Sequence, residues 1–322
     1  MTKKIKWGIA GLGNIATKFA QDLKNVPEAQ LVAVASSNMD RAQAFKQQFQ
    51  AEKAYDSYDH LNRDPDVAVI YIASLNQNHK EMTLAALAAG KGVLCEKPLG
   101  LNPKEVESMI AAAKKYDSFL MEGLWSRFNP TLQRAKQYID EGRIGTTKFL
   151  YAEFSFYRLE IPATHRLMDP QKGGGVLLDI GVYPLFLAYY ILGKPLKILA
   201  RSQFGNTGVD VQTSMLLEYE NAQAILYCGI ANESDNNAKI GGTKGEITLH
   251  GMWHNAQSIS LAQKKIKTTD KLPTTGNGFG PQIEEVNHCM SKGKKESALW
   301  THKNTLELAN MVAQVALEIK RK

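Results

Sequence analysis

The stretch IKWGIAGLGNIA, residues 5–16, joins a short apolar run to the start of an amphipathic segment. Residues 5–10 have the pattern of a buried strand, and the apolar side chains after the turn recur at helical spacing. The turn itself, Gly11-x-Gly13-x-x-Ala16, has the spacing of a dinucleotide-binding fingerprint between a strand and a helix. Gly11 permits a tight turn, Gly13 lets the backbone approach a pyrophosphate, and Ala16 allows close packing of helix on strand. This stretch predicts a Rossmann domain at the N-terminus.

The remainder of the N-terminal part alternates short apolar runs with amphipathic segments. Strands are expected at 31–35, 67–73, 92–95 and 119–121, and helices at 41–50, 80–89 and 106–115. Strands that alternate with helices in this way favour a doubly wound parallel sheet. The fold class predicted for this part is therefore α/β.

The pattern changes beyond about residue 145, where apolar and polar side chains alternate with period two. Strands are expected at 148–157, 211–219, 224–228, 246–249 and 258–261, and helices at 176–192 and 306–319. Long alternating strands favour an antiparallel sheet with one face covered by helices. We therefore expect a dinucleotide-binding domain at 1–124 and an α+β domain with a large open antiparallel sheet at 125–322. The last helix is a candidate to pack back on the first domain.

Composition excludes several classes of protein. The 322 residues are 44% hydrophobic and 22% charged, which is ordinary for a folded globular chain. The net charge of +7 is spread over small terminal and loop clusters, so a nucleic-acid partner is not expected. The chain begins without a signal-like apolar segment, and no apolar run was expected to reach the length of a membrane span. Three cysteines without CxxC spacing argue against a disulfide framework or zinc site and favour a cytoplasmic protein.

The end of the second strand decides between the two nicotinamide dinucleotides. Residues 34–38, Val-Ala-Ser-Ser-Asn, carry no acid where a carboxylate would bind the 2′-hydroxyl of the adenosine ribose. Ser37 and Asn38 can donate to a 2′-phosphate, and Arg41 follows closely enough to pair with it. Asn38 and Arg41 could equally be a helix cap and a surface residue. NADP is the expected cofactor, with NAD possible.

Two further segments carry candidate catalytic side chains. Lys97, in the triplet Glu96-Lys97-Pro98, follows a parallel strand at its carboxyl end, where ligands bind in such sheets. Asp179 and Tyr183 lie four residues apart after a run of glycines in the second domain, so they share a helical face. The predicted cofactor contacts all follow strand ends: Gly11, Gly13, Asn14, Ile15, Ser36, Ser37, Asn38, Arg41, Ser74, Leu75, Asn76, His79, Glu96 and Lys97. His79 either approaches the nicotinamide or caps the helix that begins there.

These motifs, in this order, resemble those of the glucose–fructose oxidoreductase and inositol dehydrogenase family over essentially the whole chain. Most members of that family carry histidine where this chain has Tyr183. With a tyrosine at this position, the chain resembles the branch of dimeric trans-dihydrodiol dehydrogenases and NADP-dependent D-xylose dehydrogenases. Ser37 departs from that branch, which often has arginine there, so the grip on a 2′-phosphate is expected to be weaker or less selective.

The resemblance implies a substrate pocket and an assembly. It suggests Trp125, Phe154, Trp253 and Phe279 as pocket walls, with Arg127 among the substrate-binding residues. Arg158 and His165 either contact polar substrate groups or are plain loop residues. The resemblance also implies a homodimer formed through the sheet of the second domain.

The chemistry expected of the site is oxidation of a secondary alcohol or reduction of a carbonyl. Tyr183 is the predicted acid–base, and a neighbouring ammonium such as Lys97 would stabilise its phenolate. Asp179 either orients the pair, binds a substrate hydroxyl or is a structural cap or salt-bridge partner. No metal is required, because the cofactor carries the hydride. Sugars, cyclic polyols and trans-dihydrodiols are the candidate small-molecule substrates. A catalytically silent sensor and a purely structural partner are the alternatives, and Lys97 with Tyr183 favours the enzyme.

Overall fold

The computed structural model describes residues 4–320, which form two compact units. The first unit contains the chain up to Trp125 and, in addition, the segment Thr275–Leu306. The second unit contains Ser126–Thr274 and the chain from Glu307 onward. The division predicted from sequence, 1–124 and 125–322, contains no such return of the chain to the first unit.

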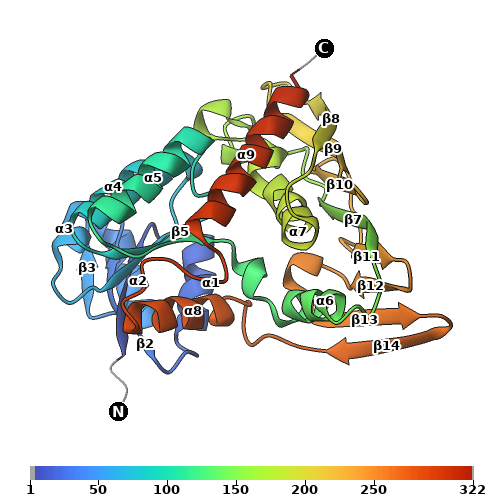
Figure 1. The fold of residues 1–322 in the computed structure, drawn as a ribbon. Helices are drawn as coiled ribbons and strands as arrows, with labels where there is room; N and C mark the ends of the chain where they lie inside the picture. The colour runs from blue at the N-terminus through green and yellow to red at the C-terminus, as the bar shows by residue number, and fades with distance from the viewer. Residues whose placement is uncertain (1–3, 321–322) are drawn as a thin grey trace. The chain divides into compact units, whose positions relative to one another are not determined.

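A six-stranded parallel sheet forms the centre of the first unit (Figure 1). Its strands are β1 (Ile5–Ala10), β2 (Ala29–Ala35), β3 (Lys53–Tyr55), β4 (Val69–Ile72), β5 (Gly92–Glu96) and β6 (Leu120–Gly123). They are ordered β3-β2-β1-β4-β5-β6, and every neighbouring pair is parallel. The predicted doubly wound sheet is confirmed. Its strand order reverses between β1 and β4, the place where such sheets bind ligands at their carboxyl ends.

Six helices cover this sheet. They are α1 (Asn14–Leu23), α2 (Met39–Phe49), α3 (Tyr58–Arg63), α4 (His79–Ala88), α5 (Pro103–Lys115) and α8 (Gly280–Ser291). Helix α4 contacts both α3 and α5, while α1 contacts α8. Strand β3 and helices α3 and α8 were not predicted from the sequence. Helix α8 is joined to β1 by a buried hydrogen bond of 3.0 Å, which the indole Nε1 of Trp7 donates to Asn287.

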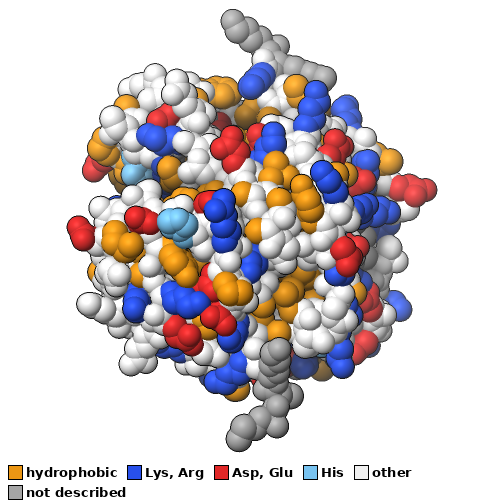
Figure 2. Space-filling model, turned by 90° about the vertical axis from the view of Figure 1, so that its left-hand side faces the viewer, with side chains coloured by type: hydrophobic (Ala, Val, Ile, Leu, Met, Phe, Trp, Pro, Cys, Tyr) orange, Lys and Arg blue, Asp and Glu red, His pale blue; other side chains and the backbone are white. Residues whose placement is uncertain are grey.

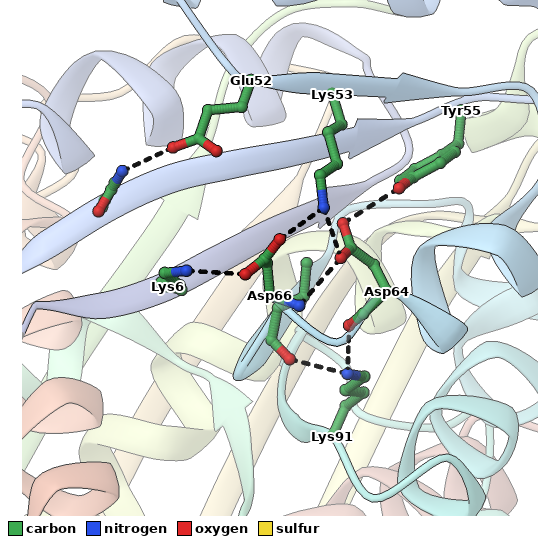
Figure 3. Close-up of polar contacts among 9 residues, drawn as sticks. Lys6, Glu52, Lys53, Tyr55, Asp64, Asp66 and Lys91 are labelled. Carbon is green, nitrogen blue, oxygen red and sulfur yellow. Dashed lines mark hydrogen bonds and ion pairs between the residues drawn. The ribbon is translucent and has the colours of Figure 1, made fainter.

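A network of charges lies before β4, at the amino ends of the strands (Figure 3). The Lys53 ammonium contacts Asp64 at 2.8 Å and Asp66 at 2.7 Å, and Tyr55 donates its hydroxyl to Asp64 at 3.1 Å. Hydrogen bonds from Lys53 and Lys6 lower the pKa of Asp66 to about 2. Burial alone would raise the pKa of Asp64, but its hydrogen bonds, led by that from Lys53, lower it. The network fixes the loop between α3 and β4, away from the carboxyl ends of the strands.

An eight-stranded sheet forms the centre of the second unit. Its strands are β7 (Thr147–Ser155), β8 (Lys197–Phe204), β9 (Asp210–Glu218), β10 (Gln223–Gly229), β11 (Ala238–Gly242), β12 (Gly245–Leu249), β13 (Ser258–Gln263) and β14 (Ile266–Lys271). They are ordered β14-β13-β12-β11-β7-β10-β9-β8. The predicted antiparallel sheet is confirmed except at its centre, where β7 and β10 run parallel. Strands β8, β11 and β14 were not predicted.

Among residues 4–320, helices contact one face of this second sheet and leave the other open. Helix α6 (Pro130–Asp140) contacts β12 and β13, and α7 (Val182–Leu192) contacts β7 and β10. The predicted helix at 176–192 begins with a π-helical turn, Leu177–Gly181, before α7. The last helix, α9 (His302–Glu318), starts in the first unit and ends in the second.

The helical stretch Pro170–Leu192 is long and apolar enough to cross a membrane by length and composition alone. This corrects the expectation that no segment approaches that length. Two thirds of its apolar window (67%) is buried inside the structure, as in a core helix of a globular unit. On the face drawn in Figure 2, acidic and basic side chains are interspersed with hydrophobic ones.

Candidate active site

The turn between β1 and α1 has the geometry of a phosphate cradle. Gly11 has φ +87°, and a Cβ there would lie 2.8 Å from the carbonyl oxygen of Ala73, so only glycine fits. Gly13 begins the helix, and nothing lies within 4 Å of where its Cβ would be. Within residues 4–320 no side chain caps this end of α1. The first N–H groups of the helix, including those of Asn14 and Ile15, are therefore available to an anion.

The end of β2 carries the residues predicted to select the cofactor. Ser36 is buried, and its hydroxyl accepts a hydrogen bond from the Asn38 N–H at 3.2 Å. Asn38 caps α2, because its side-chain oxygen accepts the N–H of Arg41 at 2.8 Å. Ser37, Asn38 and Arg41 are all exposed. The capping interpretation of Asn38 is confirmed, and its amide nitrogen and the Arg41 guanidinium still face solvent.

His79 connects the loops that follow β4 and β5. Its side chain is fully buried, with Nδ1 2.8 Å from the carbonyl oxygen of Pro98 and Nε2 3.2 Å from that of Ser74. Burial lowers the pKa of His79, so the ring is neutral at pH 7 and donates to one of the two carbonyls. The ring does not cap α4, whose cap is Asn78. With no exposed surface on His79, the predicted contact with a cofactor is not available to its ring in this structure.

The loop bearing Lys97 is held at both ends by buried carboxylates. Tyr71 donates its hydroxyl to Glu96 at 2.5 Å, and the other Glu96 oxygen accepts the Lys97 N–H at 3.3 Å. Burial raises the pKa of Glu96, and the Tyr71 hydrogen bond opposes that rise. On the far side of Pro98, the Leu99 N–H donates to Glu122 at 3.1 Å. Lys97 itself is partly buried, and the loop that carries it is fixed by these two carboxylates.

An aromatic cluster in the first unit contains two of the predicted pocket walls. The ring of Trp125 stacks on Phe279 with centroids 5.2 Å apart, and Phe279 contacts Phe19 at 5.8 Å. The segment carrying Phe279 is fixed by Asp22, a buried residue of α1. The Asp22 carboxylate accepts the backbone N–H groups of Asn277 and Phe279, both at 2.8 Å. Sequence analysis missed Asp22, because nothing local in α1 points to a partner 255 residues away.

Tyr183 lies in α7, two residues past the π-helical turn, and its side chain is buried among aromatic rings of the second unit. The rings of Phe154 and His254 each have centroids 5.3 Å from that of Tyr183. These two rings stack on each other at 4.2 Å. His254 was missed by sequence reasoning, although it follows Trp253 directly.

Asp179 lies within the π-helical turn and forms a two-pronged ion pair with Arg166. The guanidinium nitrogens lie 3.1 and 3.4 Å from the two carboxylate oxygens. The salt-bridge interpretation of Asp179 is therefore confirmed. The neighbouring His165 has its pKa lowered by burial and then by the cationic side chain of Arg158.

The other two residues taken from the resemblance are largely buried. Trp253 is fully buried and donates its indole N–H to the carbonyl oxygen of Glu153 at 2.7 Å, so it belongs to the core. Arg127 is 9% exposed, and its guanidinium lies over the ring of Tyr190 at 4.5 Å.

Comparison with known proteins places the chain among oxidoreductases. A family model described as an oxidoreductase family with an NAD-binding Rossmann fold matches residues 5–124, and the GFO/IDH/MocA C-terminal domain matches residues 132–248. The trans-1,2-dihydrobenzene-1,2-diol dehydrogenase of Mus musculus is 38% identical, over 91% of this chain and 90% of its own. The enzyme of that name from Homo sapiens is 34% identical, over 97% and 96%.

Solved structures share the fold of the whole chain. A 3-ketoreductase from Actinomadura kijaniata, crystallised with NADP and TDP-benzene, is 26% identical over 98% of each chain, with a TM-score of 0.89. An aldose-aldose oxidoreductase from Caulobacter crescentus has a TM-score of 0.91 over 99% of this chain and 98% of its own, at 22% identity. Both likenesses extend through the two units.

Proposed function

Since the chain belongs to the GFO/IDH/MocA oxidoreductase family, we propose that it is an NADP-dependent dehydrogenase or reductase acting on a CH–OH group. The proposed substrates are sugars, cyclic polyols and trans-dihydrodiols. The names of the relatives support this range, because they include diol dehydrogenases and a sugar oxidoreductase.

One observation carries the proposal: the carboxyl ends of β1, β2, β4 and β5 bring the phosphate cradle, an acid-free β2 end and Lys97 to one edge of one sheet. The open N-terminus of α1 fits a pyrophosphate, held by the N–H groups of Gly13, Asn14 and Ile15. The exposed Ser37, Asn38 and Arg41 fit a 2′-phosphate. Ser74, Leu75, Asn76, Glu96 and Lys97 are proposed to hold the ribose and nicotinamide end. When bound, the nicotinamide supplies the hydride chemistry of the reaction.

Tyr183 and Lys97 are proposed as the acid–base pair. In the oxidation direction, the phenolate form of Tyr183 would take up the proton of the substrate hydroxyl, and a bound nicotinamide would supply the hydride acceptor. The Lys97 ammonium stabilises the charge on the oxygens involved. Asp179 is proposed to orient this pair or bind a second hydroxyl of the substrate, with Arg166 fixing its carboxylate. Trp125, Phe154 and Phe279 are the proposed apolar walls.

A homodimer through the open face of the second sheet is also proposed. Phe149 on β7, Leu199 on β8 and Ile225 on β10 are exposed by 39%, 38% and 46%. All three project from the face opposite to α7, since their strand neighbours Leu150, Ala200 and Ala224 are buried. An apolar stripe on an open sheet is typical of a surface that a second copy covers. We also propose a cytoplasmic location, consistent with three buried, free cysteines.

A substrate screen tests the proposal. The protein is incubated with NADP⁺ and a panel of aldoses, inositols and diols, and reduced nicotinamide is followed at 340 nm. Turnover of at least one compound is expected, and Lys97→Met should abolish it while leaving NADP⁺ binding largely intact. Binding of NADP⁺ without turnover of any compound would favour a catalytically silent sensor. Equal affinity for NAD⁺ and NADP⁺ would refute the proposed roles of Ser37, Asn38 and Arg41.

A further inference from the structure

The helical segment that carries Asp179 and Tyr183 takes no cap from its own sequence. Within the described chain, no capping side chain precedes the π-helical turn at Val176 or α7 at Gly181. The acceptor for its first turn comes from β9, where Asp210 receives the Leu177 N–H at 2.8 Å. A carboxylate at a helix N-terminus satisfies a donor and interacts favourably with the helix dipole.

The approach of Asp210 to this segment is unusually close. Gly175 has φ +104°, and a Cβ there would lie 2.1 Å from Asp210 Oδ1. The chain before the helix therefore passes directly over the carboxylate, which only glycine permits. One turn later, a Cβ on Gly181 would lie 2.9 Å from the sulfur of Cys228 on β10. The start of the helix is thus pressed against β9 and β10.

The Asp210 carboxylate is itself fixed by hydroxyl groups of β8 and β9. Asp210 is 9% exposed, and its Oδ2 also accepts the hydroxyl of the fully buried Thr213 at 3.1 Å. The Thr213 oxygen lies 2.6 Å from the hydroxyl of Ser202 on β8. Burial raises the pKa of Asp210, and the hydrogen bonds from Leu177 and Thr213 oppose that rise. In its ionised form the carboxylate only accepts, so that Thr213 donates to Asp210 and Ser202 donates to Thr213. Three hydrogen bonds in series join β8, β9 and the start of the helix.

Tyr183 follows Leu177 by less than two turns. Its ring contacts Phe154 of β7 at the other end of this short helical segment. A shift of the helix start along the sheet would therefore move the phenol by a similar amount. A misplacement of about 1 Å can cost about 100-fold in rate.

We propose that Asp210 is a positioning residue for the reaction, because its carboxylate sets where the helix bearing Tyr183 starts on the sheet. This inference rests on the proposed function, in which Tyr183 is the acid–base. Asp210 touches neither the reacting atoms nor the cofactor cradle, which belongs to the first unit.

The test compares Asp210→Ala with Asp169→Ala as the matched control. Asp169 also accepts a backbone N–H, that of Gln171 at 2.9 Å, but it caps only the short turn before Gly175. Asp210→Ala should lower kcat about 10- to 100-fold while Asp169→Ala changes it less than about twofold. Asp210→Asn keeps an acceptor for the Leu177 N–H and should recover part of the loss. If the alanine variant does not fold, Thr213→Val, which removes one supporting hydroxyl, should show a smaller loss in the same direction.

Two readouts separate positioning from a general loss of stability. The first is hydrogen exchange of the amides of residues 177–183, which should quicken in Asp210→Ala but not in the control. The second is the isotope effect with NADPH deuterated at the transferred C4 position. It should rise, because a misplaced acid makes hydride transfer more rate-limiting, whereas partial unfolding lowers kcat and leaves the isotope effect unchanged. The Kd for NADP⁺ should not change.

The positioning role would be overturned if the wild-type protein turns over substrate but Asp210→Ala leaves the amide exchange unchanged. It would also be overturned if exchange quickens in Asp210→Ala while the isotope effect stays at the wild-type value. A wild-type protein that turns over nothing on the panel would instead refute the proposed function, and Asp210 would have no reaction to serve.

Discussion

Tyr71→Phe removes a single hydroxyl from the support of Lys97 and leaves the ring that stacks on Phe19 at 3.7 Å. Tyr71 is fully buried, and its hydrogen bond to the buried Glu96 is 2.5 Å long. Hydrogen bonds to charged groups contribute about 1.5–3 kcal/mol. We expect the free energy of unfolding to fall by about 2 kcal/mol, which corresponds to roughly 4–8 °C in Tm for a unit of this size.

The kinetic effect of this substitution follows from the pKa of Glu96. Burial already raises that pKa, and Tyr71 is the largest influence that lowers it. Without the hydroxyl, the pKa of Glu96 rises further, so the carboxyl becomes protonated at higher pH and loses its attraction for Lys97. The acid limb of the pH profile of kcat/KM should therefore move to higher pH.

Tyr55→Phe is the matched control for this prediction. It removes a phenol from a carboxylate of the same unit, Asp64, at 3.1 Å, but at the amino ends of the strands (Figure 3). It should also destabilise the protein and leave the pH profile unchanged. Thermal denaturation and the pH dependence of kcat/KM are measured for both variants. Equal pH profiles in Tyr71→Phe, Tyr55→Phe and wild type would refute the idea that Glu96 positions Lys97.

Three further substitutions test other parts of the structure. The Asp66 pKa of about 2 lies below the ordinary ~3.9, so the contribution of this carboxylate to stability is present above about pH 4 and lost toward pH 2. The urea midpoints of wild type and Asp66→Asn should therefore differ at about pH 6 and converge near pH 2. Asp22→Ala leaves buried N–H groups without an acceptor and should lower the free energy of unfolding by about 3 kcal/mol. It should raise KM for substrate more than KM for NADP⁺, because the segment that carries Phe279 is no longer held; equal rises in both KM values would contradict this. Arg166→Gln should change stability by less than about 1 kcal/mol, since its side chain is 45% exposed, yet alter KM for polyols through Asp179; an unchanged KM would remove Asp179 from substrate binding.

Features encoded by neighbouring residues were predictable from sequence. The cradle at Gly11 and Gly13 follows from local spacing, because a parallel strand, a glycine turn and a helix are contiguous in the chain. The alternation of strands and helices likewise predicted a parallel, doubly wound sheet, although not the order of its strands. The position of Lys97 at a strand end follows for the same reason. The period-two pattern of β9 likewise gave its buried face correctly.

Features that depend on partners far along the chain were not predictable. The hydrogen bonds of Asp22 to residue 277 and of Leu177 to Asp210 leave no trace in local periodicity. The parallel pairing of β7 with β10 also depends on residues far apart in the chain, such as Phe149 and Gln223. Burial was not predictable either: resemblance suggested Trp253 and Phe279 as pocket walls, and their side chains are 0% and 2% exposed in the structure.

The return of Thr275–Leu306 to the first unit has a consequence for how the protein is made. Helix α8 supplies Asn287 to Trp7, and Trp300 donates to Glu122, so the first sheet lacks part of its core until residue 300 is available. During synthesis, almost the whole chain must leave the ribosome before the cofactor-binding unit can be completed. A fragment that ends near residue 124 would expose that unfinished core, which makes aggregation the expected fate of a truncated product.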